Sequence, residues 1–258
     1  MSWLDQHPEV RNVRLGAADL NGQPRGKRVP VRFARKAEEE GTRFPLSVLN
    51  LDIWGEDVED SPLVFEIGDP DGILRPTERG YVPMPWLKVP TALLPMWMFH
   101  EDGTPFAGDP RHALRAVVDR FRDRGLTPVV ATEMEFYLVD DSGVDLRQPP
   151  SPRSGKRRPG AEILSLRALD AFDSFFNDLY DACDLMDIPA EAAISEVGLG
   201  QFEINLTHVP DALRAADDAW LFKQLVRGLA RRHGFAASFM AKPYEDYAGN
   251  GLHCHFSV

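Results

Sequence analysis

The run VVATEMEFYLV, residues 129–139, alternates between apolar and charged side chains around its centre. Successive side chains of a β-strand point to opposite faces, so Met134, Phe136 and Leu138 share one face. Glu133 and Glu135 then lie together on the other face. Carboxylates this close repel each other unless a cation lies between them. For this strand alone, a charged face turned to water and a metal site both remain open.

Two later runs, residues 201–206 and 252–258, repeat this alternation. Their apolar faces consist of Phe202, Ile204 and Leu206 in the first run, and of Leu252, Cys254, Phe256 and Val258 in the second. Their polar faces consist of Gln201, Glu203 and Asn205, and of His253, His255 and Ser257. Three amphipathic helices elsewhere in the chain are expected to cover the apolar faces. The three polar faces, together with Glu196, predict a metal site.

The side chains of this predicted site limit the choice of metal. Carboxylates with one or two imidazoles favour Mg²⁺ or Mn²⁺ over zinc or copper. Several carboxylates can hold more than one divalent ion, and clustered ions commonly bind the phosphates of a nucleotide. The sequence contains neither a P-loop nor a Rossmann glycine motif, so nucleotide binding would depend on the metals.

The chain changes character between residues 101 and 109. Before this point, strands are predicted at 10–20, 46–53, 63–67 and 92–99, a hairpin turn at Asn21-Gly22 and a helix at 32–40. After it, helices are predicted at 110–125, 166–186 and 210–233, with strands between them. We therefore expect an α+β protein with a mostly β domain over residues 1–104 and an α/β domain over residues 105–258.

Composition excludes several classes of function. The 258 residues carry 29 basic and 40 acidic side chains, a formal charge of −11, which disfavours nucleic acids and membrane surfaces as partners. Cys183 and Cys254 lack a CxxC partner, so neither a disulfide scaffold nor a thiolate zinc site is expected. The first ten residues lack the apolar segment of a signal peptide, and the apolar run 92–99 is too short to span a bilayer. These features predict a soluble, cytoplasmic protein.

An ordered set of motifs resembles the glutamine synthetase superfamily. The motifs are Asp19–Gly22, Gly26–Pro30, Arg75-Pro76, Val82–Trp86, Asp102–Phe106, Asp109–Arg111, Glu133–Phe136, Glu196–Glu203 and Asn250–His255. Each one alone is weak, but the order of the whole set is highly specific. The resemblance implies a small β-grasp-like N-terminal domain. It is followed by part of a catalytic domain, in which helices back a curved antiparallel sheet.

The resemblance also implies a role for each matched residue. Ligands of the metal beside the amino-acid substrate match Glu135, Glu196 and Glu203, and ligands of the metal on the ATP phosphates match Glu133 and His253. The histidine that contacts the transferring phosphate matches His255, and the loop that holds the substrate glutamate matches Gly249, Asn250 and Gly251. Nucleotide-side positions match Glu191 and Ser257. An acid that reaches a neighbouring subunit's active site and receives the amine matches Asp52.

The implied activity is an ATP-dependent glutamate–amine ligase that uses Mg²⁺ or Mn²⁺ and assembles into homo-oligomeric rings. Ile163 stands near the position of the tyrosine that binds ammonium in the ammonia-using enzymes. Residues 51–59 resemble the branch that joins glutamate to putrescine or a related amine. A γ-glutamylpolyamine synthetase therefore ranks ahead of glutamine synthetase proper.

Readings of other classes also stay open. Family members continue beyond the position of Val258, so the chain resembles the N-terminal part of such a ligase. A truncated, non-catalytic metal- or nucleotide-binding module is therefore the main alternative. A small metal-dependent β-barrel enzyme, suggested by His253-Cys254-His255, is disfavoured by the preceding glutamate motifs and helices.

Overall fold

The computed structural model describes residues 2–143 and 147–258. The chain forms two compact units, Met1–Leu126 and Thr127–Val258. The division falls later than the expected boundary after residue 104 because helix α4 (Pro110–Arg122) is tied to the first unit. The Asp109 carboxylate that caps this helix accepts a hydrogen bond from Met98 N at 2.7 Å, and His112 Nε2 lies 2.8 Å from Met98 O.

The first unit is built around a six-stranded mixed sheet in the order β2-β1-β6-β4-β3, with β5 paired to β6. Its strands are β1 (Asn12–Ala18), β2 (Pro24–Pro30), β3 (Thr42–Pro45), β4 (Asp71–Pro76), β5 (Val82–Pro83) and β6 (Thr91–Phe99). Its other helices are α1 (Trp3–Gln6), η1 (Val31–Phe33), α2 (Ala34–Glu40), η2 (Leu46–Leu49) and α3 (Pro62–Phe65). β1 runs parallel to β6, and every other pair is antiparallel.

The predicted hairpin at Asn21-Gly22 is confirmed. β1 and β2 pair antiparallel on either side of it, and Gly22 has a φ of 68°, which glycine adopts at little cost. The buried Asp19 carboxylate fixes the turn by accepting hydrogen bonds from Asn21 N and Gln23 N, both at 2.8 Å.

Two of the strand predictions are wrong. The run 46–53 begins as the 3-10 helix η2, and the run 63–67 falls largely in α3. Short apolar runs do not by themselves distinguish a strand from a helix. Pro62 occupies the first helical position of α3, where its fixed φ and missing N–H are tolerated. The expected strand at 92–99 and the helix within 32–40 are confirmed as β6 and α2.

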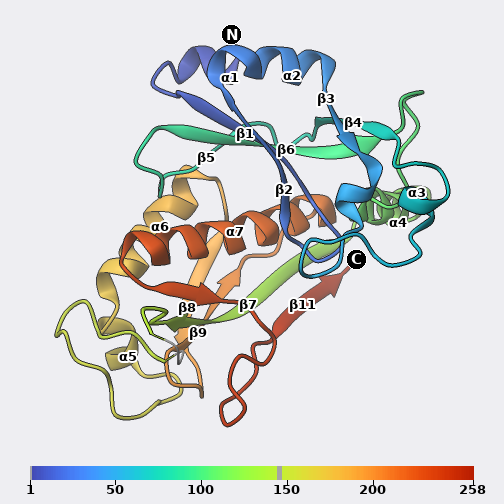
Figure 1. Cartoon of the computed structure of the whole chain (residues 1–258). Helices are drawn as coiled ribbons and strands as arrows, with labels where there is room; N and C mark the ends of the chain where they lie inside the picture. Colours follow the sequence, from blue (N-terminus) through green and yellow to red (C-terminus); the bar gives the residue numbers. More distant parts are fainter. Residues whose placement is uncertain (1, 144–146) are drawn as a thin grey trace. The chain divides into compact units, whose positions relative to one another are not determined.

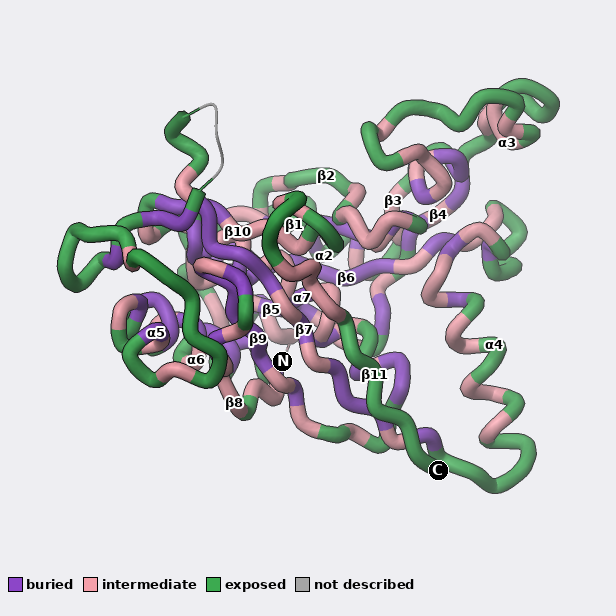
Figure 2. Tube along the Cα trace, turned by 90° about the horizontal axis from the view of Figure 1, so that it is seen from below, coloured by how far each residue is buried: buried purple, intermediate pink, exposed green. Residues whose placement is uncertain are grey.

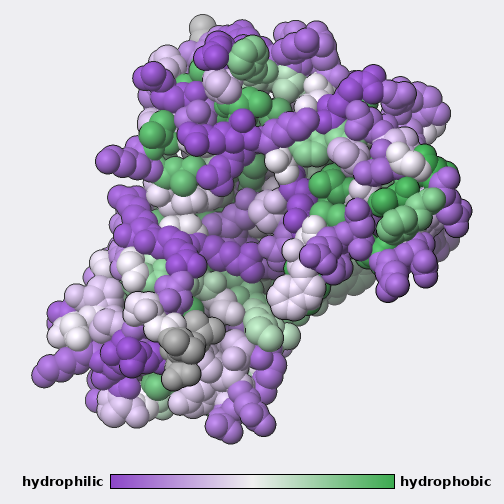
Figure 3. Space-filling model, in the orientation of Figure 1, coloured by the Kyte–Doolittle hydropathy of each residue, from purple (hydrophilic) through white to green (hydrophobic). Residues whose placement is uncertain are grey.

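Large apolar side chains remain exposed in the segment between η2 and β4. They are Ile53, Trp54, Val58, Phe65 and Ile67. Figure 3 shows hydrophobic side chains gathered over α3 in this part of the first unit. Isolated exposed apolar residues are common, but a group of this kind is typical of an interaction surface.

The second unit contains a five-stranded antiparallel sheet. Its strands are β7 (Val129–Val139), β8 (Ala190–Ser195), β9 (Gln201–Leu206), β10 (Ala236–Ser238) and β11 (Leu252–Ser257). β7 is central: β9 pairs with one of its edges, and β10 and β11 pair with successive parts of the other. The strands expected at 129–139 and 201–206 therefore have the predicted bounds.

Helices cover one face of this sheet. The unit contains α5 (Leu166–Asp170), α6 (Asp173–Leu185) and α7 (Ala212–Arg232), and α6 and α7 lie against the sheet (Figure 1). Ring centroids lie 5.1 Å apart for Phe176 and Phe202 and 6.5 Å apart for Phe136 and Phe222. The apolar faces of β7 and β9 thus meet these helices. The single helix expected at 166–186 is instead divided between α5 and α6 near Ala171.

The apolar face of β11 differs from this pattern. All six residues of the strand are exposed, whereas β7 beside it is largely buried (Figure 2). The expectation that helices cover all three apolar faces is therefore wrong for β11. Across the described parts of the chain, helices never combine the length and the apolar character that a membrane crossing requires.

Candidate functional site

The cross-strand register of β7, β9 and β11 collects the predicted polar residues on the face opposite the helices. Glu133 pairs with Asn205 of β9 on one side and with His253 of β11 on the other. Glu135 pairs with Glu203 in the next row. Residues directly opposite in a sheet project to the same face, so the three strands present one continuous polar surface.

Glu133, Glu203 and His253 form the most compact group on this surface. One ligand atom from each lies within 4.8 Å of the others. His253 Nδ1 lies 3.1 Å from Glu133 Oε2 and 3.9 Å from Glu203 Oε2. Glu203 is buried, and its Oε1 accepts a hydrogen bond from Asn205 Nδ2 at 3.0 Å. Two carboxylates and an imidazole at this spacing match the ligand set of a divalent cation.

His255 approaches the same group from its edge. Its Nε2 lies 2.9 Å from Glu133 Oε1, so Glu133 has one histidine beside each carboxylate oxygen. The ring of His208 lies beside His255 with a centroid separation of 5.9 Å. Sequence reasoning missed His208. Its position two residues after β9 was the only available signal.

Two carboxylates on this surface, Glu196 and Glu203, have raised pKa values. Burial raises the pKa of Glu196, and repulsion from Glu135 and Glu203 raises it further. Burial also raises the pKa of Glu203, while the hydrogen bond from Asn205 opposes this shift and Glu133 and Glu135 add to it. A bound divalent cation would reverse both effects by stabilising the charged forms. The donor set therefore fits a metal.

The loop that leads into β11 lies against Glu135. A Cβ atom added to Gly251 would stand 2.8 Å from Glu135 Oε1. A residue larger than glycine would therefore displace this carboxylate. Gly251 O accepts a hydrogen bond from Glu135 N at 3.1 Å. Asn250 and Gly249 both accept hydrogen bonds from the side chain of Gln201. Hydrogen bonds thus join the loop residues 249–251 to Glu135 and Gln201.

Comparison with known proteins identifies the family of the chain. The family model described as "Glutamine synthetase, catalytic domain" matches residues 107–258. The chain belongs to the glutamine synthetase family. The match begins shortly before α4, whereas the compact units divide after that helix.

Several curated members of the glutamine synthetase family align with almost the whole chain. Gamma-glutamylputrescine synthetase PuuA of Escherichia coli is 41% identical over 99% of this chain and 55% of its own length. Glutamine synthetase of Pyrococcus horikoshii is 31% identical over 98% of this chain and 52% of its own length. Glutamate–isopropylamine ligase of a Pseudomonas species is 30% identical over 99% of this chain and 56% of its own length. The chain spans about half the length of these relatives.

Solved structures agree with the family assignment. A structure titled as a novel glutamine synthase homolog has a TM-score of 0.82 and 28% identity, over 96% of this chain and 55% of its own. An ADP complex of GmaS also has a TM-score of 0.82, with 26% identity over 98% of this chain and 54% of its own. The α+β architecture expected from the sequence therefore corresponds to a glutamine synthetase-like fold over this part of the family's length.

Some residues matched to the family lie outside the cluster. Glu191 is exposed on β8, and Ser257 is exposed at the end of β11. Asp52 belongs to the other compact unit, where its Oδ1 accepts hydrogen bonds from Trp54 N and Glu56 N. Ile163 is 58% exposed, but its neighbour Leu164 donates a hydrogen bond to Ser195 O, beside Glu196.

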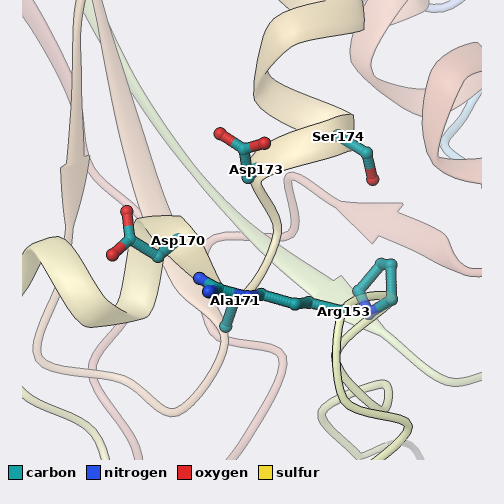
Figure 4. Close-up of a pocket in the computed structure, with 6 residues that line it drawn as sticks. Arg153, Asp170, Ala171, Asp173 and Ser174 are labelled. Atoms are coloured by element: carbon teal, nitrogen blue, oxygen red, sulfur yellow. The ribbon is translucent and has the colours of Figure 1, made fainter.

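A surface pocket lies elsewhere in the second unit. It measures about 600 Å³ and is lined by Pro152, Arg153, Asp170, Ala171, Asp173 and Ser174 (Figure 4). None of these is a residue that the family motifs match. The nearby basic run 156–158 is partly occupied by internal ion pairs, since Arg157 contacts Asp140 and Arg158 lies 3.6 Å from Glu162. The candidate site therefore remains the carboxylate–imidazole surface of the sheet.

Proposed function

We propose that the protein containing this chain is an ATP-dependent ligase that joins the γ-carboxylate of glutamate to an amine. The observation that carries this proposal is the convergence of Glu133, Glu203 and His253 on one face of a sheet of glutamine synthetase type. Phosphoryl transfer needs concentrated positive charge beside the phosphates, and this carboxylate-rich surface is suited to hold it.

The metals we propose are Mg²⁺ or Mn²⁺, at two or more positions. Glu133 and His253 would hold one ion, and Glu135, Glu196 and Glu203 would hold another. The raised pKa values of Glu196 and Glu203 support this assignment because they arise from burial and mutual repulsion. When bound, such ions neutralise the developing charge on the phosphoryl group.

The chain's own residues would orient the two substrates and move one proton. The glycine-containing loop 249–251 would hold glutamate so that its γ-carboxylate attacks the terminal phosphorus of ATP, which yields γ-glutamyl phosphate and ADP. His255 would contact the transferring phosphate, and Glu191 and Ser257 would lie on the nucleotide side. The amine nitrogen would then attack the acyl carbon and displace phosphate, while Asp52 of a neighbouring subunit accepts the amine's proton. The side-chain hydrogen bonds of Asp52 within the described chain use Oδ1.

We propose putrescine or a related alkyl amine as the second substrate, ahead of ammonia. Identity to gamma-glutamylputrescine synthetase is 41%, against 31% for the glutamine synthetase named above. Ile163 offers hydrocarbon in place of a phenol. Hydrocarbon cannot hydrogen-bond a cation, but it can contact methylene groups at roughly 0.8 kcal/mol for each one buried.

A substrate comparison on the protein translated from the complete reading frame tests this proposal. Phosphate release would be measured with ATP and glutamate, and with ammonia, putrescine or isopropylamine as the amine. We expect kcat/KM for putrescine to exceed that for ammonia. Equal or better use of ammonia would establish a glutamine synthetase instead, and no amine-dependent release would establish a non-catalytic module.

The assembly and the first unit belong to the same proposal. We propose a β-grasp-like first domain over residues 1–104, supported by the parallel pairing of β1 and β6 and by helix α2. We also propose homo-oligomeric rings in the cytoplasm. Asp52 matches an acid that reaches a neighbouring subunit. The exposed apolar side chains of residues 53–67 follow Asp52 directly in sequence, and they therefore support self-association.

A further inference from the structure

Gln201 links three segments of the second unit through one buried side chain. It is the first residue of β9 and is only 1% exposed. Its Nε2 donates to Glu135 Oε2 at 2.7 Å, to Gly249 O at 2.9 Å and to Asn250 Oδ1 at 3.2 Å. Its Oε1 accepts a hydrogen bond from Gly198 N at 2.9 Å. Both ends of the amide are therefore satisfied, and every partner lies beside the carboxylate cluster.

Tyr137 holds the same loop from the opposite strand. It pairs with Gln201 across β7 and β9, and its hydroxyl donates to Ala248 O at 2.7 Å. Gly198 fits against both side chains, because an added Cβ atom would stand 1.9 Å from the Tyr137 hydroxyl and 2.6 Å from Gln201 Oε1. The loop residues 248 and 249 are therefore anchored by two buried polar side chains of the sheet.

Asn250 fixes the other side of the loop. Its Nδ2 donates to Met240 O at 2.8 Å and to Ser238 O at 3.2 Å, and its backbone N donates to Ala241 O at 2.8 Å. These bonds tie the loop to the segment that follows β10. The Gln201 amide donates both to this loop and to a carboxylate of the cluster.

We infer that Gln201 is a positioning residue that couples the substrate loop 248–251 to the metal-site carboxylate Glu135. This inference rests on the proposed function in naming glutamate as the substrate and Glu135 as a metal ligand. The Gln201 side-chain amide donates a hydrogen bond to Oε2 of Glu135, and Oε1 of the same carboxylate faces Gly251. The side chain thereby sets the distance between the group that binds the amino acid and a group that binds its cation.

This coupling depends on the two N–H groups of the amide, and not on the volume of the side chain. Methionine has a similar length and volume but offers no donor. Gln201→Met would leave Glu135 Oε2 and Gly249 O without their buried partner, which destabilises the arrangement more than loss of an exposed hydrogen bond does. The loop would still be held by Asn250, so we expect it to loosen without unfolding the sheet.

Hydrogen exchange of the loop amides tests the inference without any enzymatic activity. We expect Gln201→Met to accelerate exchange at residues 249–251 by about tenfold or more, consistent with loss of a buried hydrogen-bonding partner. Mn²⁺ titration of the same protein should show weaker binding. Gln148→Met is the matched control, because Gln148 is also buried in the second unit and, among the described residues, its side chain makes no hydrogen bond to the loop. Unchanged exchange in Gln201→Met would overturn the inference.

A second variant separates anchoring of the loop from the contact with Glu135. Tyr137→Phe removes only the hydroxyl that anchors Ala248, and the ring remains in place. We expect faster exchange at residues 248–250 with little change in Mn²⁺ binding, since Tyr137 does not contact Glu135 by a hydrogen bond. Equal weakening of Mn²⁺ binding in both variants would overturn the specific role of Gln201.

Kinetics then separate positioning from general damage. In the active protein, Gln201→Met should raise KM for glutamate about tenfold and leave KM for ATP within about twofold, because only the glutamate loop loses its anchor. A parallel rise in both constants would contradict the coupling. Absence of activity in the unaltered protein would refute the proposed ligase, while exchange and Mn²⁺ titration would still decide the role of Gln201.

Discussion

Glu203 is the buried acid of the compact candidate metal-binding group, and His253 Nδ1 lies 3.9 Å from its Oε2. Glu203→Gln keeps the shape of the side chain and removes the charge. We expect Mn²⁺ affinity to fall by at least about 10-fold, the loss typical of removing even an outer partner of a metal site. Isothermal titration measures this directly.

The matched control for this substitution is Glu191→Gln. Glu191 is exposed on the neighbouring strand β8, and no ion pair or hydrogen bond joins it to the cluster within the described residues. Its Mn²⁺ affinity should stay within about twofold of the unaltered protein, because exposed charges at a distance are screened by salt. Equal losses in the two variants would show that net charge, and not ligation, governs binding.

The two cysteines give a residue-level test of the fold. Burial raises the pKa of the Cys183 thiol to about 12, whereas Cys254 is exposed on β11. The thiolate is the reactive form, so at pH 8 iodoacetamide should label Cys254 and leave Cys183 unmodified until the protein unfolds. Mass spectrometry of the labelled peptides checks this outcome. Rapid native labelling of Cys183 would contradict its buried position on α6.

At the scale of elements, the approach of the loop to β7 predicts the effect of a single methyl group. In Gly251→Ala the new Cβ atom would stand 2.8 Å from Glu135 Oε1 and 3.4 Å from His253 Nε2, so the carboxylate must move. We expect weaker Mn²⁺ binding by about tenfold, since ligand geometry is sensitive to such displacements.

Gly160→Ala is the control for this prediction. Gly160 has an ordinary φ and open space around the added Cβ atom. The substitution should leave both Mn²⁺ binding and the melting temperature unchanged. Should Gly251→Ala behave like this control, the close approach of the loop to Glu135 would have no functional consequence.

The strands that bear the site were the most predictable elements. β9 alternates over its length and β7 around its centre, and the bounds of both strands agree with the sequence pattern. The short strands β3 and β5 have no such pattern, and the apolar runs at 46–53 and 63–67 predicted strands where helices form. In these segments, proline and burial by neighbouring elements decide the conformation, and a local pattern does not record them.

The residues of the candidate site were also predictable only in part. Alternation placed Glu133, Glu203 and His253 on one face, and the register of three strands brings them together. The role of Gln201 was not predictable from pattern, because its partners lie in a loop more than forty residues later. The exposed apolar face of β11 was also missed, since amphipathicity shows which face can be covered but not what covers it.

For the molecule as a whole, metal binding and pH should act on stability together. The raised pKa values of Glu196 and Glu203 mean that their contribution is fully present below the unfolded value of about 4.3 and is lost as pH rises through the folded values. A cation offsets this loss when the carboxylates are charged. We therefore expect Mn²⁺ to raise the melting temperature more at pH 7.5 than at pH 5.

Thermal unfolding at the two pH values, with and without Mn²⁺, measures this effect. At a free Mn²⁺ concentration of 100 times Kd, binding should add about 2.7 kcal/mol to the free energy of unfolding. Glu203→Gln should lose most of the increase at pH 7.5. An equal rise at both pH values would show that Mn²⁺ binds groups other than these carboxylates.

The distance along the chain between the partners Glu133 and His253 has a consequence for how the protein is made. These side chains are 120 residues apart in sequence, and β11 is the last strand to be synthesised in the described sheet. Contacts of such long range form late, after the local helices and hairpins. A nascent chain that has not yet docked β11 lacks both histidines of the cluster. Capture of a divalent cation would therefore mark the completion of folding, and Mn²⁺ binding should lag behind helix formation when the unfolded protein is returned to native conditions.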